Sequence, residues 1–180
     1  VDTALTTSAL VIAEPGTQME SSISFTIKLN RVLEHTTDTI ALVLPTFTIA
    51  SPAGVSTSPG CGTTAFTAAA TNSGEADATL TLTAKTATLA ADSECTVTVA
   101  TGVTTSAQAQ AANFADRTVA ATLASAANIA AAASSISPST EVVAPTAAFP
   151  YSQLVHATPV PTALSCTALT VALRRPRRHG

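Results

Sequence analysis

Three cysteines carry the most specific chemistry in this 180-residue chain. Cys61 lies in the turn sequence SPGCG, and Cys95 lies on the apolar side of the alternating stretch ECTVTVA. Two such cysteines in a secreted chain form a disulfide, which across a loop of about 35 residues contributes a few kcal/mol through chain entropy. We therefore predict a Cys61–Cys95 bridge, the alternative being two buried, unpaired thiols. Cys166 then has no partner within the chain. It is expected to be either a half-buried free thiol or a cysteine that pairs with another chain.

The three histidines do not form a recognisable catalytic or metal-binding pattern. His35, His156 and His179 are far apart, with no cysteine or carboxylate at the spacing of metal ligands. The sequence HTTD at His35–Asp38 is either one metal ligand or a solvated turn, and we expect the turn. The chain lacks the calcium-loop, G-x-S-x-G, H-E-x-x-H and phosphate-loop motifs. We expect no enzyme, no metal and no cofactor; a hydrolase with His35 or His156 beside a serine and a carboxylate is the third hypothesis.

The charge and aromatic content argue against two classes of ligand. The chain has no Trp and a single tyrosine, Tyr151, so the aromatic platforms of carbohydrate-binding modules are scarce. Half of the eight basic residues fall in the last seven positions and leave an acidic body, which argues against nucleic-acid binding. This basic tail is a solvated end, a processing site, or a charged clasp on an acidic neighbouring copy. Its residues are Arg174, Arg175, Arg177 and Arg178.

The composition is neutral and rich in hydroxyl groups, as in secreted surface proteins. Charged residues make up 11% of the chain, against about a quarter in typical domains. We expect a secreted, extracellular protein without a membrane span, because no apolar run of about 18 residues occurs; the initial Val suggests a mature form after removal of a signal peptide. The chain has no N-x-S/T sequon, so sugars are expected on proline-adjacent hydroxyls. The candidates are Ser51, Ser58, Ser137, Ser139, Thr140, Thr146, Thr158 and Thr162.

Apolar residues recur with a period of two, which predicts half-buried strands. The expected inward-facing residues are Leu10, Ile12, Ile23, Phe25, Ile27, Leu29, Ile40, Leu42, Leu44, Leu80, Leu82, Cys95, Val97, Val99, Val119, Ala121 and Leu123. Proline- and glycine-containing turns are expected at residues 14–16, 51–54, 58–62 and 72–77. This pattern predicts an all-β, antiparallel β-sandwich of jelly-roll or Ig-like type. One short helix is expected near Ser106–Ala112, where Ala and Gln favour helix.

After residue 133 the chain becomes rich in proline and loses the long alternation of apolar residues. We therefore predict that it is divided into four segments. Residues 1–133 form the sandwich, with the alanine run 130–133 extended or in a loop. Residues 134–162 form an extended, Pro/Ser/Thr-rich linker arm. Residues 163–173 form a C-terminal connector strand, and residues 174–180 form the basic tail. The arm is expected to be pinned to a surface by Val142, Val143, Phe149 and Tyr151.

The chain ends with a copy of its own beginning. Val160–Ala172 repeats Val1–Ala13, with roughly half of the positions identical. Either the chain is one unit of a tandem array, or the final strand docks beside or in place of the equivalent strand of a neighbour. Such a contact does not close on itself and gives a filament. The expected inter-subunit residues are Leu164, Cys166, Leu169, Val171 and Leu173.

Several stretches together resemble known repeated domains. These are SISFTIKLNRVLEHTTDTIALVLPTFTI, SPGCG, TLTLTA and ECTVTVATGV. They are similar to the secreted β-sandwich domains of long algal and other microbial surface proteins, and to the jelly-roll subunits of glycosylated extracellular fibrils that link head to tail through a C-terminal strand. The resemblance implies a fibre-forming structural protein whose partners are identical subunits and covalent glycans. The alternative is a cell-surface adhesin or carbohydrate-binding module.

Overall fold

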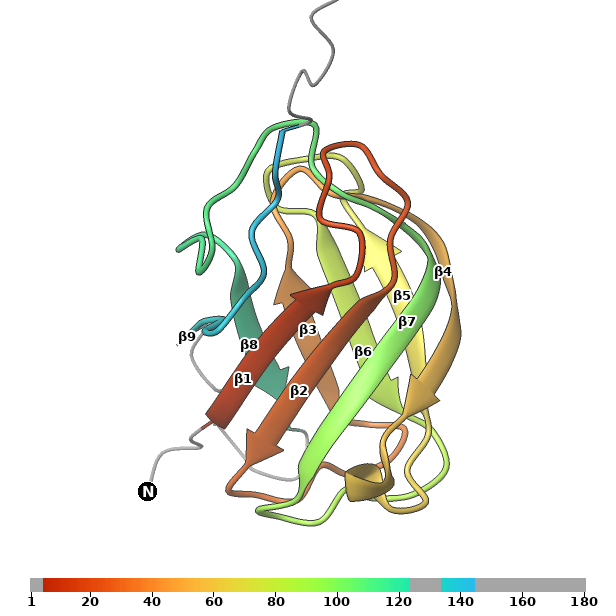
Figure 1. Ribbon diagram of the computed structural model, residues 1–180. Helices are drawn as coiled ribbons and strands as arrows, with labels where there is room; N and C mark the ends of the chain where they lie inside the picture. Colours follow the sequence, from red (N-terminus) through yellow and green to blue (C-terminus); the bar gives the residue numbers. More distant parts are fainter. Residues whose placement is uncertain (1–4, 124–133, 145–180) are drawn as a thin grey trace, which may run out of the picture. The chain divides into compact units, whose positions relative to one another are not determined.

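A computed structural model describes residues 5–123 and 134–144, which form two antiparallel sheets packed against each other (Figure 1). The strands are β1 (Leu5–Ile12), β2 (Ile23–Leu29), β3 (Thr39–Val43), β4 (Thr48–Thr57), β5 (Phe66–Thr71), β6 (Thr79–Ala84), β7 (Glu94–Thr104), β8 (Thr118–Thr122) and β9 (Ser134–Ser135), with a 3-10 turn η1 (Pro59–Cys61). One sheet has the order β1-β2-β7-β4 and the other β5-β6-β3-β8-β9. The predicted antiparallel β-sandwich is confirmed.

The core forms where the alternation predicts it. Every residue that was expected to face inward is buried, and along β2 buried and half-buried residues strictly alternate. The outer faces carry mainly hydroxyl groups and few charges, such as Lys28 opposite Glu94. Thr39, for example, lies between Thr83 and Thr122 in the sheet register. On the other sheet, the hydroxyls of Thr26 and Thr96 are hydrogen-bonded at 2.7 Å. The low charge of the chain therefore reflects two threonine-rich outer surfaces.

Strands β4 and β5 are absent from the sequence-based prediction. The turn expected at residues 51–54 is wrong, because these residues form a bulge inside β4, where the register shifts between Ile49 and Ala53. Ser51 and Gly54 have positive φ values of 52° and 65°, which bulges tolerate. Strand β5 is short and built from Thr and Ala after Phe66, so it lacks the large apolar residues that mark a strand.

The expected short helix near Ser106–Ala112 is also wrong, because no residue of this stretch is helical. Tertiary contacts hold it in an irregular loop. The backbone of Gln110 exchanges two hydrogen bonds with Val142, at 2.9 and 2.8 Å, and its side-chain amide donates to Pro45 O at 2.8 Å. These bonds outweigh the weak helix preference of Ala and Gln.

The sandwich extends beyond the boundary expected at residue 133. Strand β9 pairs with β8, and Ile136 and Val142 are buried in the core. The first part of the predicted arm, residues 134–144, is therefore integrated in the domain, because its apolar side chains fill the core and its backbone completes hydrogen bonds. Val142 pins it, whereas Val143 is exposed. The other predicted anchors Phe149 and Tyr151, and the alanine run 130–133, lie outside the described residues.

Because of the bulge in β4, we expect two glycine-to-alanine substitutions to differ in how much they lower the free energy of unfolding. Gly102, with φ 81°, faces the β4 bulge, and an added Cβ would lie 2.5 Å from Ala50 O. Gly74 has a similar φ of 85°, but an added Cβ would meet only Thr48 Oγ1, at 3.9 Å. We expect Gly102→Ala to lower the free energy of unfolding by about 2–4 kcal/mol and Gly74→Ala by about 1–2 kcal/mol, measured by urea unfolding. Equal losses would mean that the bulge moves freely to admit the methyl group.

Candidate functional site: the edges of the sandwich

One side of the sandwich is closed by the chain itself. Residues 134–144, here called the closing segment, run along the outer edge of β1 (Figure 1). The N–H of Leu10 donates to Pro138 O at 2.9 Å, and the N–H of Thr140 donates to Leu10 O at 3.0 Å. The same segment contributes β9 to the other sheet, next to β8. A single segment thus covers the end strands of both sheets on this side.

A buried arginine ties the closing segment to the domain. Arg117 has no exposed surface. Its Nε and Nη2 donate to Gln110 Oε1 at 3.1 and 2.9 Å, and its Nη1 donates to Ser139 Oγ at 3.4 Å and to Thr140 O. The guanidinium also lies 5.6 Å from the ring centroid of Phe47, within the range of a cation–π contact. One side chain thereby connects β8, the preceding loop and the closing segment.

The charge of Arg117 is held by neutral groups. Its described acceptors are an amide oxygen, a hydroxyl and a backbone carbonyl. Burial lowers the pKa of Arg117 from its ordinary value, because desolvation disfavours the charged form. Arginine nevertheless stays protonated in proteins, so the buried cation depends on these acceptors. Sequence reasoning missed this residue; its only signal was a charge directly before a buried strand in a chain poor in charge.

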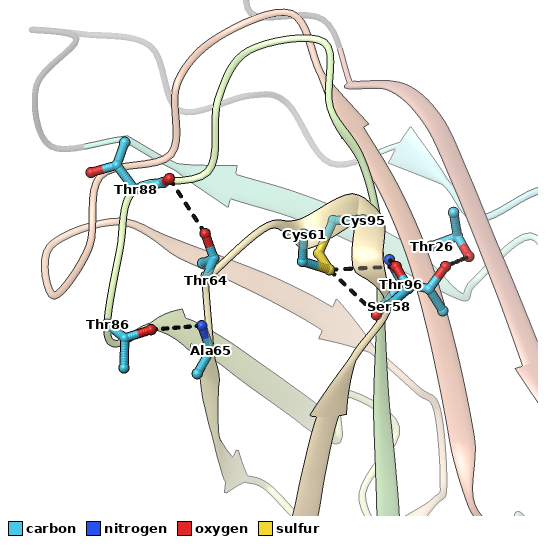
Figure 2. Close-up of a disulfide and its surroundings, with 9 residues drawn as sticks. All are labelled: Thr26, Ser58, Cys61, Thr64, Ala65, Thr86, Thr88, Cys95 and Thr96. Atoms are coloured by element: carbon cyan, nitrogen blue, oxygen red, sulfur yellow. Dashed lines mark hydrogen bonds between the residues drawn. A yellow bond between two sulfur atoms is a disulfide. The ribbon is translucent and has the colours of Figure 1, made fainter.

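The predicted disulfide is present on the side where β4 and β5 are linked (Figure 2). Cys61 of η1 and Cys95 of β7 are bonded, with a Cα–Cα distance of 4.5 Å, and both are buried. Next to the bridge, the N–H of Thr96 donates to Ser58 Oγ at 3.0 Å. The bridge therefore fastens the connection between the two sheets onto the central strand β7.

Strand β5 has a free edge among the described residues. It lies at the end of its sheet and pairs with β6 alone. The N–H of Lys85 donates to Ala65 O at 2.7 Å, so by the alternation of an antiparallel ladder the backbone groups of Phe66, Ala68 and Ala70 point away from β6. No described residue forms a hydrogen bond with these outward groups.

The two edges on this side differ in how they are protected. Bulges and prolines are common devices that keep edge strands from pairing with other chains. Strand β4 has both, with Pro52 inside its bulge. Strand β5 keeps an unbroken register with β6 and contains no proline, glycine or charged residue. The β5 edge is therefore suited to accept a further strand.

The candidate glycosylation sites in the described residues fall into three groups. Ser51 and Ser137 are exposed. Ser58 and Thr140 are half-buried, and both hydroxyls take part in hydrogen bonds. Ser139 is only 5% exposed and accepts a hydrogen bond from Arg117, so its hydroxyl is the least accessible of the described candidates in the folded domain.

Several predicted functional residues lie outside the described residues. They include the inter-subunit strand, the basic tail, the remaining glycosylation candidates and two of the histidines. These residues are Thr146, His156, Thr158, Thr162, Leu164, Cys166, Leu169, Val171, Leu173, Arg174, Arg175, Arg177, Arg178 and His179. The described domain shows the surfaces that could receive this part of the chain.

The stretch around His35 forms a turn held by an aspartate. Asp38 is buried, and its Oδ2 accepts the N–H of Glu34 at 2.8 Å. His35 is exposed, with Nδ1 3.4 Å from Thr88 Oγ1. Within residues 5–123 and 134–144, no group of three or more His, Cys, Asp or Glu side chains could hold a metal. In the same part of the chain, no helix has the length and apolarity needed to cross a membrane.

Two shallow hollows lie at the loop end of the sandwich and share Thr46 and Gln108. The first is lined by Gln18, Thr46, Thr48, Gly74, Thr104, Thr105, Ser106, Ala107 and Gln108. This lining is neutral and polar and has no aromatic ring. The first hollow offers hydrogen bonds to a ligand but no aromatic ring, whereas the lining of the second includes one ring, Phe114, and one carboxylate, Asp116.

Comparisons with protein-family models, with curated proteins and with solved structures find no match to this chain. The features of the chain that bear on its function are the closed side of the sandwich, the free β5 edge, the disulfide, and the strand pattern in the sequence after the domain.

Proposed function

We propose that this chain is the structural subunit of an extracellular filament. Each copy donates its C-terminal strand, residues 163–173, to the sandwich of the next copy. The observation that carries the proposal is that the described sandwich is complete without this strand. Its core is filled and its β1 edge is covered by the closing segment. The strand pattern in the sequence after Ala144 therefore cannot replace a core strand, and it can only be added at an edge that is still free, such as β5.

Several chemical features of the chain are typical of extracellular proteins and support this proposal. Structural disulfides persist in oxidising compartments, and Cys61–Cys95 is such a bridge between two buried cysteines. The exposed hydroxyls of Ser51 and Ser137 suit covalent sugars. A donor strand followed by four arginines suits the acidic body of an identical subunit. The resemblance to domains of microbial surface fibrils supports the same proposal.

Deleting Val160–Gly180 tests the proposed function. We expect the wild-type chain to form filaments with an axial repeat of one domain in electron micrographs. The truncated chain is expected to remain a monomer with the circular dichroism and unfolding temperature of the wild type, because the described core does not need the deleted strand. A chain lacking only residues 174–180 is the control that separates the strand from the tail. Filaments of normal length from the Val160–Gly180 deletion would overturn the proposal.

A further inference from the structure

We propose that the free edge of β5, Phe66–Thr71, is the site that receives residues 163–173 of a second copy of this chain. The inference rests on the proposed function and deepens it by naming the surface on which the donated strand docks. Three independent features of the described domain support it: the backbone groups of β5, the side chains beneath its edge, and the charges at its two ends.

The backbone of β5 offers the hydrogen bonds that strand addition needs. The outward N–H and C=O groups of Phe66, Ala68 and Ala70 repeat every second residue, as an incoming strand requires. The other edges are less suitable: β1 is occupied by the closing segment, β8 by β9, and β4 is interrupted by its bulge. Of the edges in the described residues, β5 is the regular one without a partner.

The side chains on the inner face of the β5 edge are small. Ala68 and Ala70 point toward the core but are only partly buried, and Val55 of the neighbouring β4 is also partly buried at the core's margin. In the donor strand, Leu169 and Val171 alternate with small residues and share one face. Large apolar side chains placed beside these alanines would cover the exposed margin of the core and remove apolar surface from water, which favours docking.

The charges favour one orientation of the donor. The hairpin loop after β5 carries Glu75 and Asp77, both exposed, whereas Lys85 lies beside Ala65 at the other end of the strand. A donor that runs parallel to β5 places its basic tail, residues 174–180, near the two carboxylates and away from the lysine. Exposed ion pairs are weak and screened by salt, so they orient the strand while the backbone and apolar contacts hold it.

The donor and the acceptor are different parts of each subunit. Residues 163–173 dock on β5 of the next copy, which leaves that copy's own residues 163–173 free to dock in turn, so the contact is heterologous, as a filament requires. The 18 residues of 145–162 can span up to about 60 Å when extended. This exceeds the width of a five-stranded sheet, about 20–25 Å, so the test must distinguish docking onto a second copy from docking within one chain.

The first experiment blocks the β5 edge in the full-length chain with Ala68→Pro. The N–H of Ala68 points away from β6, so proline removes an outward donor without removing a bond to β6. The matched control is Thr57→Pro on β4, whose N–H points away from β7 because the N–H of Ser58 donates to Thr96 O. We expect both variants to stay folded, Ala68→Pro to lose filaments, and Thr57→Pro to keep them.

The outcomes separate this inference from the proposed function. Normal filaments from Ala68→Pro, together with none from the Val160–Gly180 deletion, would show that the acceptor lies elsewhere while strand donation stands. A wild-type chain that never forms filaments would overturn both proposals. A loss of filaments in Ala68→Pro with an unchanged unfolding temperature supports the β5 edge.

A second experiment remains decisive if the proline variant does not fold. In the donor strand, Cys166 lies on the face opposite to Leu169 and Val171. Thr67→Cys or Ala69→Cys, on the exposed outer face of β5, should therefore form an intermolecular disulfide with Cys166 in the full chain under mild oxidation. We expect ladders of covalent oligomers on non-reducing gels, absent after reduction and absent when Cys166→Ser is added. Ala120→Cys, on the outer face of β8 in the same sheet, is the control. Equal trapping by the control, or a cross-link confined to the monomer, would overturn the inference.

Discussion

Replacing both bridge cysteines, in the double variant Cys61→Ser/Cys95→Ser, is expected to lower the free energy of unfolding by about 4 kcal/mol, because the bridge closes a long loop in the unfolded chain. The two cysteines are 34 positions apart, and both sulfurs lie among buried residues. The unfolded state of the variant gains the conformational freedom that the bridge removes. Urea unfolding under non-reducing conditions measures the loss.

Two controls identify the bridge as the cause of this loss. Cys166→Ser keeps the bridge and removes the third thiol, so its free energy of unfolding should equal that of the wild type. Wild-type protein that is fully reduced before unfolding should match the double variant. A loss below about 1 kcal/mol would contradict the expectation, because the unfolded chain would then retain enough structure to make the bridge redundant.

The disulfide and the strand faces were predictable from the sequence because they follow from local, periodic chemistry. In the strand TLTLTA, a shift of the pairing register by one residue would bury threonines in place of Leu80 and Leu82. The same alternation aligned Cys95 with Val97 and Val99, which placed its sulfur inside the sandwich. Pairing with Cys61, in the turn SPGCG, was expected because such cysteines form disulfides in secreted chains, and the structure confirms both expectations.

The edges of the sandwich were not predictable in the same way. Strand β4 carries a bulge at SPAG, and this sequence has the composition of a turn. Strand β5 has Ala68 and Ala70 where a core strand would have larger residues. An edge strand with small inward side chains carries little of the hydrophobic pattern from which strands are recognised, and these are the features that give the edge its proposed function.

The closing segment escaped prediction because its contacts are long-range. Thr140 bonds to Leu10 across most of the chain, and Ser139 meets Arg117 through a hydroxyl. Proline and serine in SISPST indicate an extended linker by composition, and only the folded partners show that its backbone covers an edge. The assignment of residues 134–144 to the arm was therefore a consequence of reading composition without those partners.

The second large effect is expected for Arg117→Met, which should lower the free energy of unfolding by about 3–5 kcal/mol because it leaves buried polar groups without partners. Methionine keeps much of the side-chain volume, but Gln110 Oε1 and Thr140 O lose their donors. Urea unfolding measures the total loss. Amide hydrogen exchange should show the closing segment opening faster relative to β2 and β7, because the arginine is what holds that segment by its side chain.

Two comparisons test whether the Arg117 network is the cause. Arg117→Lys should recover only part of the stability, since an ammonium group cannot reproduce the forked donation of the guanidinium. Lys85→Met, at an exposed position, should change stability by at most about 0.5 kcal/mol.

Burial lowers the pKa of Arg117, so the cost of its charged form is relieved only above its folded pKa, at strongly alkaline pH. The difference between wild type and Arg117→Met should therefore stay constant from about pH 5 to 9. If amide exchange became faster to the same extent in all strands, this role of Arg117 would be contradicted, because the closing segment would then be held by the core as a whole.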